Sequence, residues 1–303
     1  MNLTNTSDAP LWDDYFSESL RLDEIDFCIV LIVSLVQLLV LGLLIKSERT
    51  VVRQKPSPKA LTSVNVLILL MIVSNCFVSG FKFYTWKSIN DTFLLIVYST
   101  VMNFSLSVHL FVLVCYTWIR GIPVIQQCFP WAYPMLKGCL ILFGLIQFVA
   151  FLASVATNVS LVVSSLSAYW EALAQINLYL SFTIDAYIFV FDIVVILFYL
   201  RYLASISKEP AIHDIQRLKI ISRYGIVSCL WLELWLSSYV AFNSFSSQTI
   251  PSVGISAYLA ASGFFNLGIL IYVSIQLAMK WFLVKEKKLR LSIVLEMQKQ
   301  HRR

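Results

Sequence analysis

Charge is scarce in this sequence. Only 13% of the 303 residues are Asp, Glu, Lys or Arg, against about 25% in ordinary soluble domains. Hydrophobic residues make up 59% of the chain, and the mean hydropathy is +0.78. A soluble fold of this length needs far more polar surface. The composition therefore argues against soluble enzymes, nucleic-acid-binding domains and disordered proteins, and predicts a helical membrane protein that crosses the bilayer several times.

Several motifs that are typical of catalytic, nucleotide-binding and metal-binding sites are also missing. The sequence has no Gly-x-Ser-x-Gly, no Walker loop, no His-Glu-x-x-His, no Cys-x-x-Cys and no His-rich tract. We therefore expect no enzyme activity, no metal site and no cofactor. Five cysteines lie inside apolar runs (Cys28, Cys76, Cys115, Cys139 and Cys229), and Cys128 lies in a short predicted loop. Buried cysteines of this kind act as small hydrophobic residues, so disulfides are not expected.

Seven apolar runs are each long enough to cross a bilayer, which takes about 20 residues. They cover residues 25–45, 61–81, 93–119, 135–156, 172–200, 220–242 and 253–279. The acidic residues 1–24 lack the basic start and apolar core of a secretory signal peptide. We therefore expect an acidic extracellular tail (1–24), a bundle of seven transmembrane helices (25–279) and a cytoplasmic basic tail (280–303).

The positions of the basic residues predict the orientation. All but three of the 23 Lys and Arg residues fall on one side of the predicted membrane, and the exceptions are Arg21, Lys82 and Lys87. Basic residues collect on the cytoplasmic side. The N-terminus is therefore expected outside and the C-terminus inside.

Four glycosylation sequons fall on the predicted outer side, at Asn2, Asn5, Asn90 and Asn158. They favour the secretory route, a glycoprotein and the plasma membrane, although triplets of this kind also arise by chance. Asn90 and Asn158 lie close to the predicted membrane, so for these two an unmodified side chain is an equal alternative.

The C-terminal tail has an amphipathic pattern. Phe282, Leu289, Ile293 and Met297 fall near one helical face, and basic residues surround them. This pattern predicts an amphipathic helix that lies on the inner leaflet of the bilayer.

Four ionisable residues lie within the predicted spans: His109, Asp185, Asp192 and Glu233. Such residues are costly inside a membrane and commonly mark function. If spans three, five and six adjoin, these residues would line one acidic cavity that favours a small cationic extracellular ligand, with Asp185 as the leading contact. Asp192 has alternatives: it could bind an ion, share a proton with Glu233 or pair with His109. All four groups could instead be structural and bridge neighbouring helices.

Two motifs resemble those of the G-protein-coupled receptor superfamily. Cys115-Tyr-Thr-Trp-Ile-Arg120 ends span three, and Gly263-Phe-Phe-Asn266 precedes Tyr272 in span seven. Arg120 is placed like the arginine of the family's Asp-Arg-Tyr motif, although Ile119 replaces the acidic residue. Asn266 and Tyr272 resemble a loose Asn-Pro-x-x-Tyr without its proline.

The resemblance implies a divergent seven-helix receptor in the plasma membrane that senses a small extracellular ligand and couples to a heterotrimeric G protein. Arg120, Asn266 and Tyr272 would act in activation. A proton-coupled carrier that uses the buried ionisable residues is the main alternative. It is weakened by the absence of an internal repeat. A membrane-embedded enzyme comes last.

Overall fold

The computed structural model describes residues 9–52, 62–160, 162–163, 165–206, 215–247 and 255–301, and these residues form helices and short connections without any strand. The helices are α1 (Ala9–Val52), α2 (Ser63–Lys87), α3 (Thr92–Cys128), α4 (Ala132–Ser160), the short 3₁₀ helix η1 (Ser167–Tyr169), α5 (Trp170–Ile206), α6 (Ile215–Ser247) and α7 (Ile255–His301). The predicted all-helical architecture is confirmed.

Six helices, α1 to α5 and α7, are long and apolar enough to cross a membrane over the described residues. The chain is therefore a multi-pass membrane protein. The sixth predicted span, residues 220–242, lies on α6, and α6 is not among these six helices. Its described part carries Lys219, Arg223 and Glu233, and these charges lower its hydropathy.

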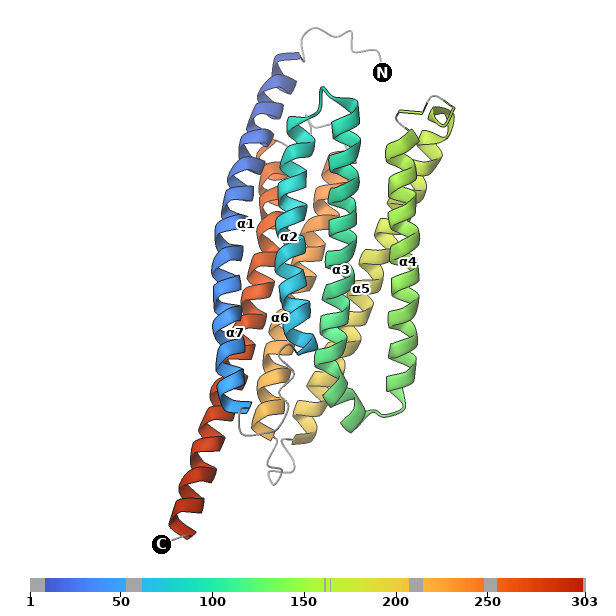
Figure 1. The fold of residues 1–303 in the computed structure, drawn as a ribbon. Helices are drawn as coiled ribbons and strands as arrows, with labels where there is room; N and C mark the ends of the chain where they lie inside the picture. Colours follow the sequence, from blue (N-terminus) through green and yellow to red (C-terminus); the bar gives the residue numbers. More distant parts are fainter. Residues whose placement is uncertain are drawn as a thin grey trace.

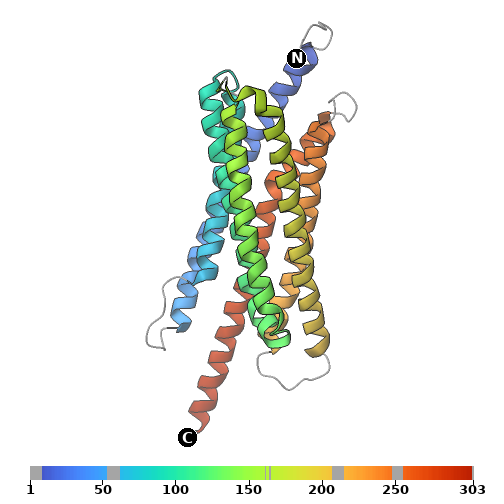
Figure 2. The same ribbon diagram turned by 90° about the vertical axis from the view of Figure 1, so that its right-hand side faces the viewer.

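The helices form a bundle in which each helix contacts the next, and α7 closes the ring by packing against α1 and α2 (Figures 1 and 2). Large hydrophobic side chains fill the interior, among them Tyr116, Phe143 and Tyr199. On α1 and α4 most of the apolar surface faces outward, as Leu39 and Phe148 do. An outer surface of this kind suits contact with lipid.

Two helix N-termini follow the local rules of capping. The Thr62 hydroxyl accepts a hydrogen bond from the Asn65 N–H at the start of α2, and the Asp91 carboxylate accepts bonds from Phe93 N–H and Leu94 N–H at the start of α3. These caps satisfy backbone donors that lack a partner within the helix. They fix where α2 and α3 begin.

Both ends of the described chain differ from the sequence-based expectation. The acidic segment 1–24 is not a separate tail over its described part, because residues 9–24 are the first turns of α1, with Pro10 in the first turn, where proline is tolerated. Residues 280–301 do not form a separate helix along the membrane. They continue α7, which projects beyond the bundle (Figures 1 and 2). No Gly or Pro interrupts this stretch, and a Glu286–Arg290 ion pair supports it.

Candidate functional site

Arg120 lies near the C-terminal end of α3 and is almost fully buried, with 6% of its surface exposed. Its guanidinium group reaches three other helices. Nε donates to the Tyr199 hydroxyl on α5 at 3.2 Å, and Nη1 donates to Ser228 Oγ on α6 at 2.6 Å. Nη1 also donates to Gln276 Oε1 on α7 at 3.1 Å, and Nη2 lies 3.5 Å from Cys229 Sγ. One side chain therefore links α3, α5, α6 and α7.

Aromatic side chains enclose this arginine. The guanidinium carbon lies 5.8 Å from the Tyr116 ring centre and 5.7 Å from the Tyr199 ring centre, within the range of cation–π attraction. Tyr272 is buried close to the same charge. Tyr199 fits against α6 because residue 225 is glycine: a Cβ there would lie 2.7 Å from the ring. We call Arg120 and its neighbours Tyr116, Tyr199, Ser228, Cys229, Tyr272 and Gln276 the Arg120 cluster.

Two carboxylates adjoin the Arg120 cluster. Asp192 on α5 is buried and interacts with the Cys229 thiol and the Arg120 charge. Glu233 lies one turn beyond Cys229 on α6, and the Asp192 charge acts on it. Asp192 Oδ2 and both Glu233 carboxylate oxygens have no hydrogen-bond partner among the described residues. The structure therefore brings these two predicted residues together, beside Arg120.

The other two ionisable residues of the predicted cavity lie apart from that pair. His109 is fully buried and hydrogen bonds through Nδ1 to Ser74 Oγ on α2 at 2.9 Å, and its Nε2 has no partner in the described chain. Asp185 is buried two helical turns from Asp192 along α5. No described bond joins His109 or Asp185 to Asp192 or Glu233.

The two α7 residues expected in activation lie in different environments. Tyr272 belongs to the Arg120 cluster. Asn266 lies toward the N-terminal end of α1, where its Nδ2 donates to Asp26 Oδ2 at 2.7 Å and its Oδ1 lies 3.5 Å from Lys82 Nζ. Lys82 also pairs with Asp23 at 2.9 Å. The six-residue spacing explains the separation, because it is not a whole number of turns and spans about 9 Å along a helix.

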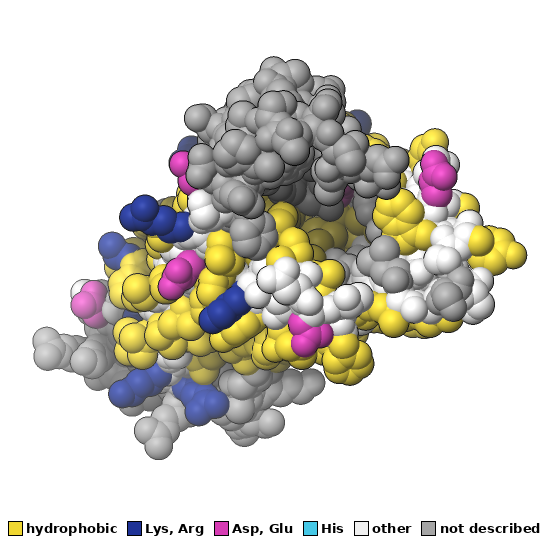
Figure 3. Space-filling model, turned by 90° about the horizontal axis from the view of Figure 1, so that it is seen from above, with side chains coloured by type: hydrophobic (Ala, Val, Ile, Leu, Met, Phe, Trp, Pro, Cys, Tyr) yellow, Lys and Arg dark blue, Asp and Glu magenta, His cyan; other side chains and the backbone are white. Residues whose placement is uncertain are grey.

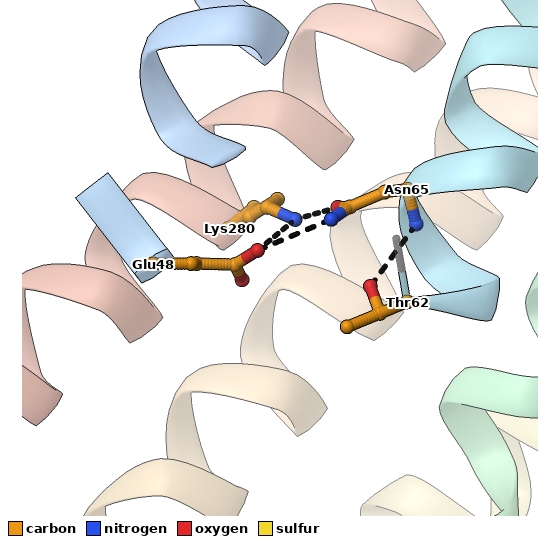
Figure 4. Close-up of polar contacts among 4 residues, drawn as sticks. All are labelled: Glu48, Thr62, Asn65 and Lys280. Carbon is orange, nitrogen blue, oxygen red and sulfur yellow. Dashed lines mark hydrogen bonds and ion pairs between the residues drawn. The ribbon is translucent and has the colours of Figure 1, made fainter. Parts of the chain in front are cut away.

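A second polar cluster joins the same three helices, α1, α2 and α7, at their opposite end (Figure 4). Lys280 Nζ donates to Glu48 Oε2 at 3.0 Å and to Asn65 Oδ1, and Asn65 Nδ2 donates to the same Glu48 oxygen at 3.2 Å. Between the polar contacts around Asn266 and those around Lys280, Gln37 Nε2 donates to Leu270 O at 2.8 Å and to Ser274 Oγ at 3.0 Å. Polar contacts therefore tie α1 to α7 at three levels.

Helices α6 and α7 are tied by two indole groups. Trp231 Nε1 donates to Gly268 O at 2.7 Å, and Trp235 Nε1 donates to Phe265 O at 2.8 Å. Trp235 also stacks on the Phe265 ring. These bonds place both tryptophans in the helix interface.

The sequons differ in their surroundings. Asn2 and Asn5 lie outside the described residues. Asn90 is exposed in the turn between α2 and α3. Asn158 is half-buried, and its Nδ2 lies 3.3 Å from both Ser99 Oγ and Thr100 Oγ1 on α3. The Asn158 amide is thus used in helix packing, whereas the Asn90 amide is accessible.

Figure 3 shows the end of the molecule at which α1 begins. Hydrophobic side chains dominate the part that the structure describes there, and charged ones are scattered among them. Within the described ranges, no group of three or more His, Cys, Asp or Glu side chains could hold a metal ion.

Sequence reasoning missed the partners of Arg120 and both polar clusters of α1, α2 and α7. Helical spacing offered one signal: Asp192 and Tyr199 are seven residues apart, and Tyr272 and Gln276 are four apart, so each pair shares a helix face. Nothing in the sequence pairs Lys82 with Asp23 or Lys280 with Glu48, because these contacts join helices distant along the chain.

Comparisons with known proteins identify no relative: no protein-family model, curated protein or solved structure matches this chain.

Proposed function

We propose that this protein is a divergent signalling receptor of the plasma membrane, similar to G-protein-coupled receptors, with seven membrane crossings and its N-terminus outside. In this proposal α6 supplies the seventh crossing. The asymmetry of Lys and Arg supports the orientation. The N-terminal end of α1 then faces outward, and the end that holds Glu48 and Lys280 faces the cytoplasm.

The observation that carries the proposal is the Arg120 cluster. A receptor must connect a ligand on one side of the membrane to a partner on the other through two states of the bundle. Arg120 bonds near the cytoplasmic ends of α5, α6 and α7 at once. Interhelical hydrogen bonds in membranes are worth only about 0.6–2 kcal/mol each. Ligand binding can therefore favour a state in which α6 leaves Arg120 and exposes a surface for a heterotrimeric G protein.

The ligand of this proposal is a small extracellular cation. Asp185, Asp192 and Glu233 provide three carboxyl groups on the facing helices α5 and α6. Unpartnered carboxylate oxygens at Asp185, Asp192 and Glu233 are available to accept hydrogen bonds from an ammonium group. His109 is committed to Ser74 and is a secondary candidate.

The test is recruitment of G proteins in cells that express the full chain, measured by proximity without added ligand. Arg120→Ala should raise basal recruitment while surface expression persists, because α6 then loses the bond that holds it to α3 in the absence of ligand. Lys137→Ala removes a positive charge from an exposed site on α4 and is the matched control, with recruitment retained. Equal recruitment by the unaltered chain and by Arg120→Ala would contradict the proposal.

A proton-coupled carrier is the second candidate, and the unpartnered oxygens of Asp192 and Glu233 favour it. In a carrier, such buried carboxyl groups bind and release the coupling proton. Proteoliposomes that contain the full chain would then show a proton flux that disappears in Asp192→Asn. A flux unaffected by this substitution would count against the carrier.

A further inference from the structure

Arg120 carries one positive charge, whereas two acidic side chains, Asp192 and Glu233, lie beside it. Arg120 is always protonated in proteins, and its four hydrogen-bonding partners, Tyr199, Ser228, Gln276 and Cys229, are neutral groups. No ion pair to Arg120 is formed within the described chain. A buried charge needs a compensating charge close by.

Asp192 and Glu233 are the acidic groups that can compensate Arg120. The Arg120 charge acts on Asp192, and the Asp192 charge acts on Glu233. Among the described residues, the other titratable groups that interact with Asp192 are Tyr199 on α5, Cys229 on α6 and Tyr272 on α7, and Tyr116 on α3 interacts with Arg120. Phenols and thiols that are buried favour their neutral forms. The Arg120 cluster and the two adjoining residues together thus contain one fixed positive charge and two carboxyl groups.

Two ionised carboxylates beside one arginine would leave a net negative charge inside the membrane. Two protonated carboxyl groups would leave the arginine uncompensated. A single proton gives a neutral cluster, and carboxyl groups that interact strongly take up protons as a pair. The hydrogen bonding agrees, because Asp192 Oδ2 and both Glu233 oxygens are unpartnered in the described structure.

We propose that Asp192 and Glu233 form a proton-binding site that holds one shared proton, with Arg120 as the counter-ion of the remaining negative charge. The proton comes from solvent water and forms an O–H bond to one carboxylate oxygen, so the site changes by one positive charge when it fills or empties. The site would serve a receptor or a carrier equally, and its existence does not depend on which of these the protein is.

The number of protonated carboxyl groups tests this site. It can be measured from the infrared carbonyl band of carboxylic acids, which shifts in D₂O, using the full chain in lipid nanodiscs at neutral pH. All variants are compared in an Asp185→Asn background, which removes the contribution of the other buried α5 carboxyl group. Asp192→Asn and Glu233→Gln should each remove the band, because the single remaining carboxylate then pairs with Arg120.

Substitutions of Arg120 give the opposite result. Arg120→Gln should double the band, because a cluster without the positive charge is neutral only with two protons. Arg120→Lys keeps the charge and should leave the band unchanged. If Arg120→Gln does not fold, the loss of the band in Asp192→Asn and in Glu233→Gln still tests the shared proton.

Three results would overturn the shared-proton site. The first is a band that survives in Glu233→Gln, which would mean that Asp192 is protonated on its own. The second is a band that neither carboxyl variant removes. The third is a band of equal size in Arg120→Gln and Arg120→Lys. Because the readout is spectroscopic, these results are independent of G-protein recruitment.

Discussion

The contact between α6 and α7 depends on the absence of a side chain at Gly268. A Cβ at this position would collide with Trp235 Cδ1 and would lie 3.2 Å from Trp235 Cγ. Trp235 is only 2% exposed, its indole N–H is bonded to Phe265 O, and its ring centre lies 5.3 Å from that of Phe265. The indole is therefore fixed on several sides. We predict that Gly268→Ala forces α6 and α7 apart.

The size of the effect follows from two losses. Overpacking a well-packed interior costs about 1–3 kcal/mol. Displacing Trp235 also breaks its bond to Phe265 O, which adds about 0.6–2 kcal/mol in a membrane. Gly263→Ala is a matched control on the same helix, because a Cβ there meets no atom of the described residues within 4 Å. The intrinsic gain from glycine to alanine in a helix is common to both variants and cancels in their difference. Gly268→Ala should thus be less stable than Gly263→Ala by about 2–5 kcal/mol.

The comparison requires reversible unfolding of both purified variants in one mixed detergent, followed by helical circular dichroism. Tryptophan fluorescence gives a local readout, because displacement of Trp235 alters its surroundings only in Gly268→Ala. If the two variants unfold with the same free energy, the close approach of α6 and α7 at Gly268 is wrong. A loss of stability in Gly263→Ala alone would refute the packing of this face of α7.

Two further predictions concern the ends of the bundle. Lys280→Met should lower stability by about 2 kcal/mol, less than the ~3–5 kcal/mol of a fully buried pair, because the Glu48 side chain is 30% exposed. Glu48→Gln combined with Lys280→Met should recover part of that loss, and a double-mutant cycle in denaturant measures it. Asn90→Gln should remove one glycan and increase gel mobility, whereas Asn158→Gln should not, because the half-buried Asn158 amide contacts Ser99 and Thr100 on α3; the opposite pattern would contradict this packing of Asn158.

Much of the helical architecture could be predicted from hydropathy alone, because a bilayer requires long apolar helices. Each of the seven predicted runs falls on a helix over nearly all of its described residues, although the described part of α6 lacks the apolar character of the other six. The ends were predicted less well. Polar residues 9–24 and 280–301 continue α1 and α7, because helix propensity extends a helix past the apolar run until a breaking residue or cap stops it.

The candidate site was only partly predictable. Asp192 and Glu233 stand out because charge is costly in a membrane. Their grouping with Arg120 depends on how α3, α5 and α6 rotate against one another, which one sequence does not reveal. His109 shows the same limit: its environment was predicted to be acidic, but Ser74 on α2 is its partner. Lys82 and Lys280 appeared only as topology signals, and both form interhelical ion pairs.

The positions of these bonds bear on how α6 could move within the bundle. Helix α7 is tied to α1 and α2 near Asn266 and Lys280, so it provides a fixed reference. Helix α6 is held by Arg120 at Ser228, and it is bonded to α7 through Trp231 and Trp235, which lie about one and two turns beyond Ser228 toward the C-terminal end. If α6 moves in signalling, the backbone-bonded tryptophans should therefore act as the pivot while the Arg120 bonds break. If α6 instead shifted away from α7 along its whole length, the tryptophan bonds and the Arg120 bonds would both have to break. That motion would require a much larger share of the ligand's binding energy.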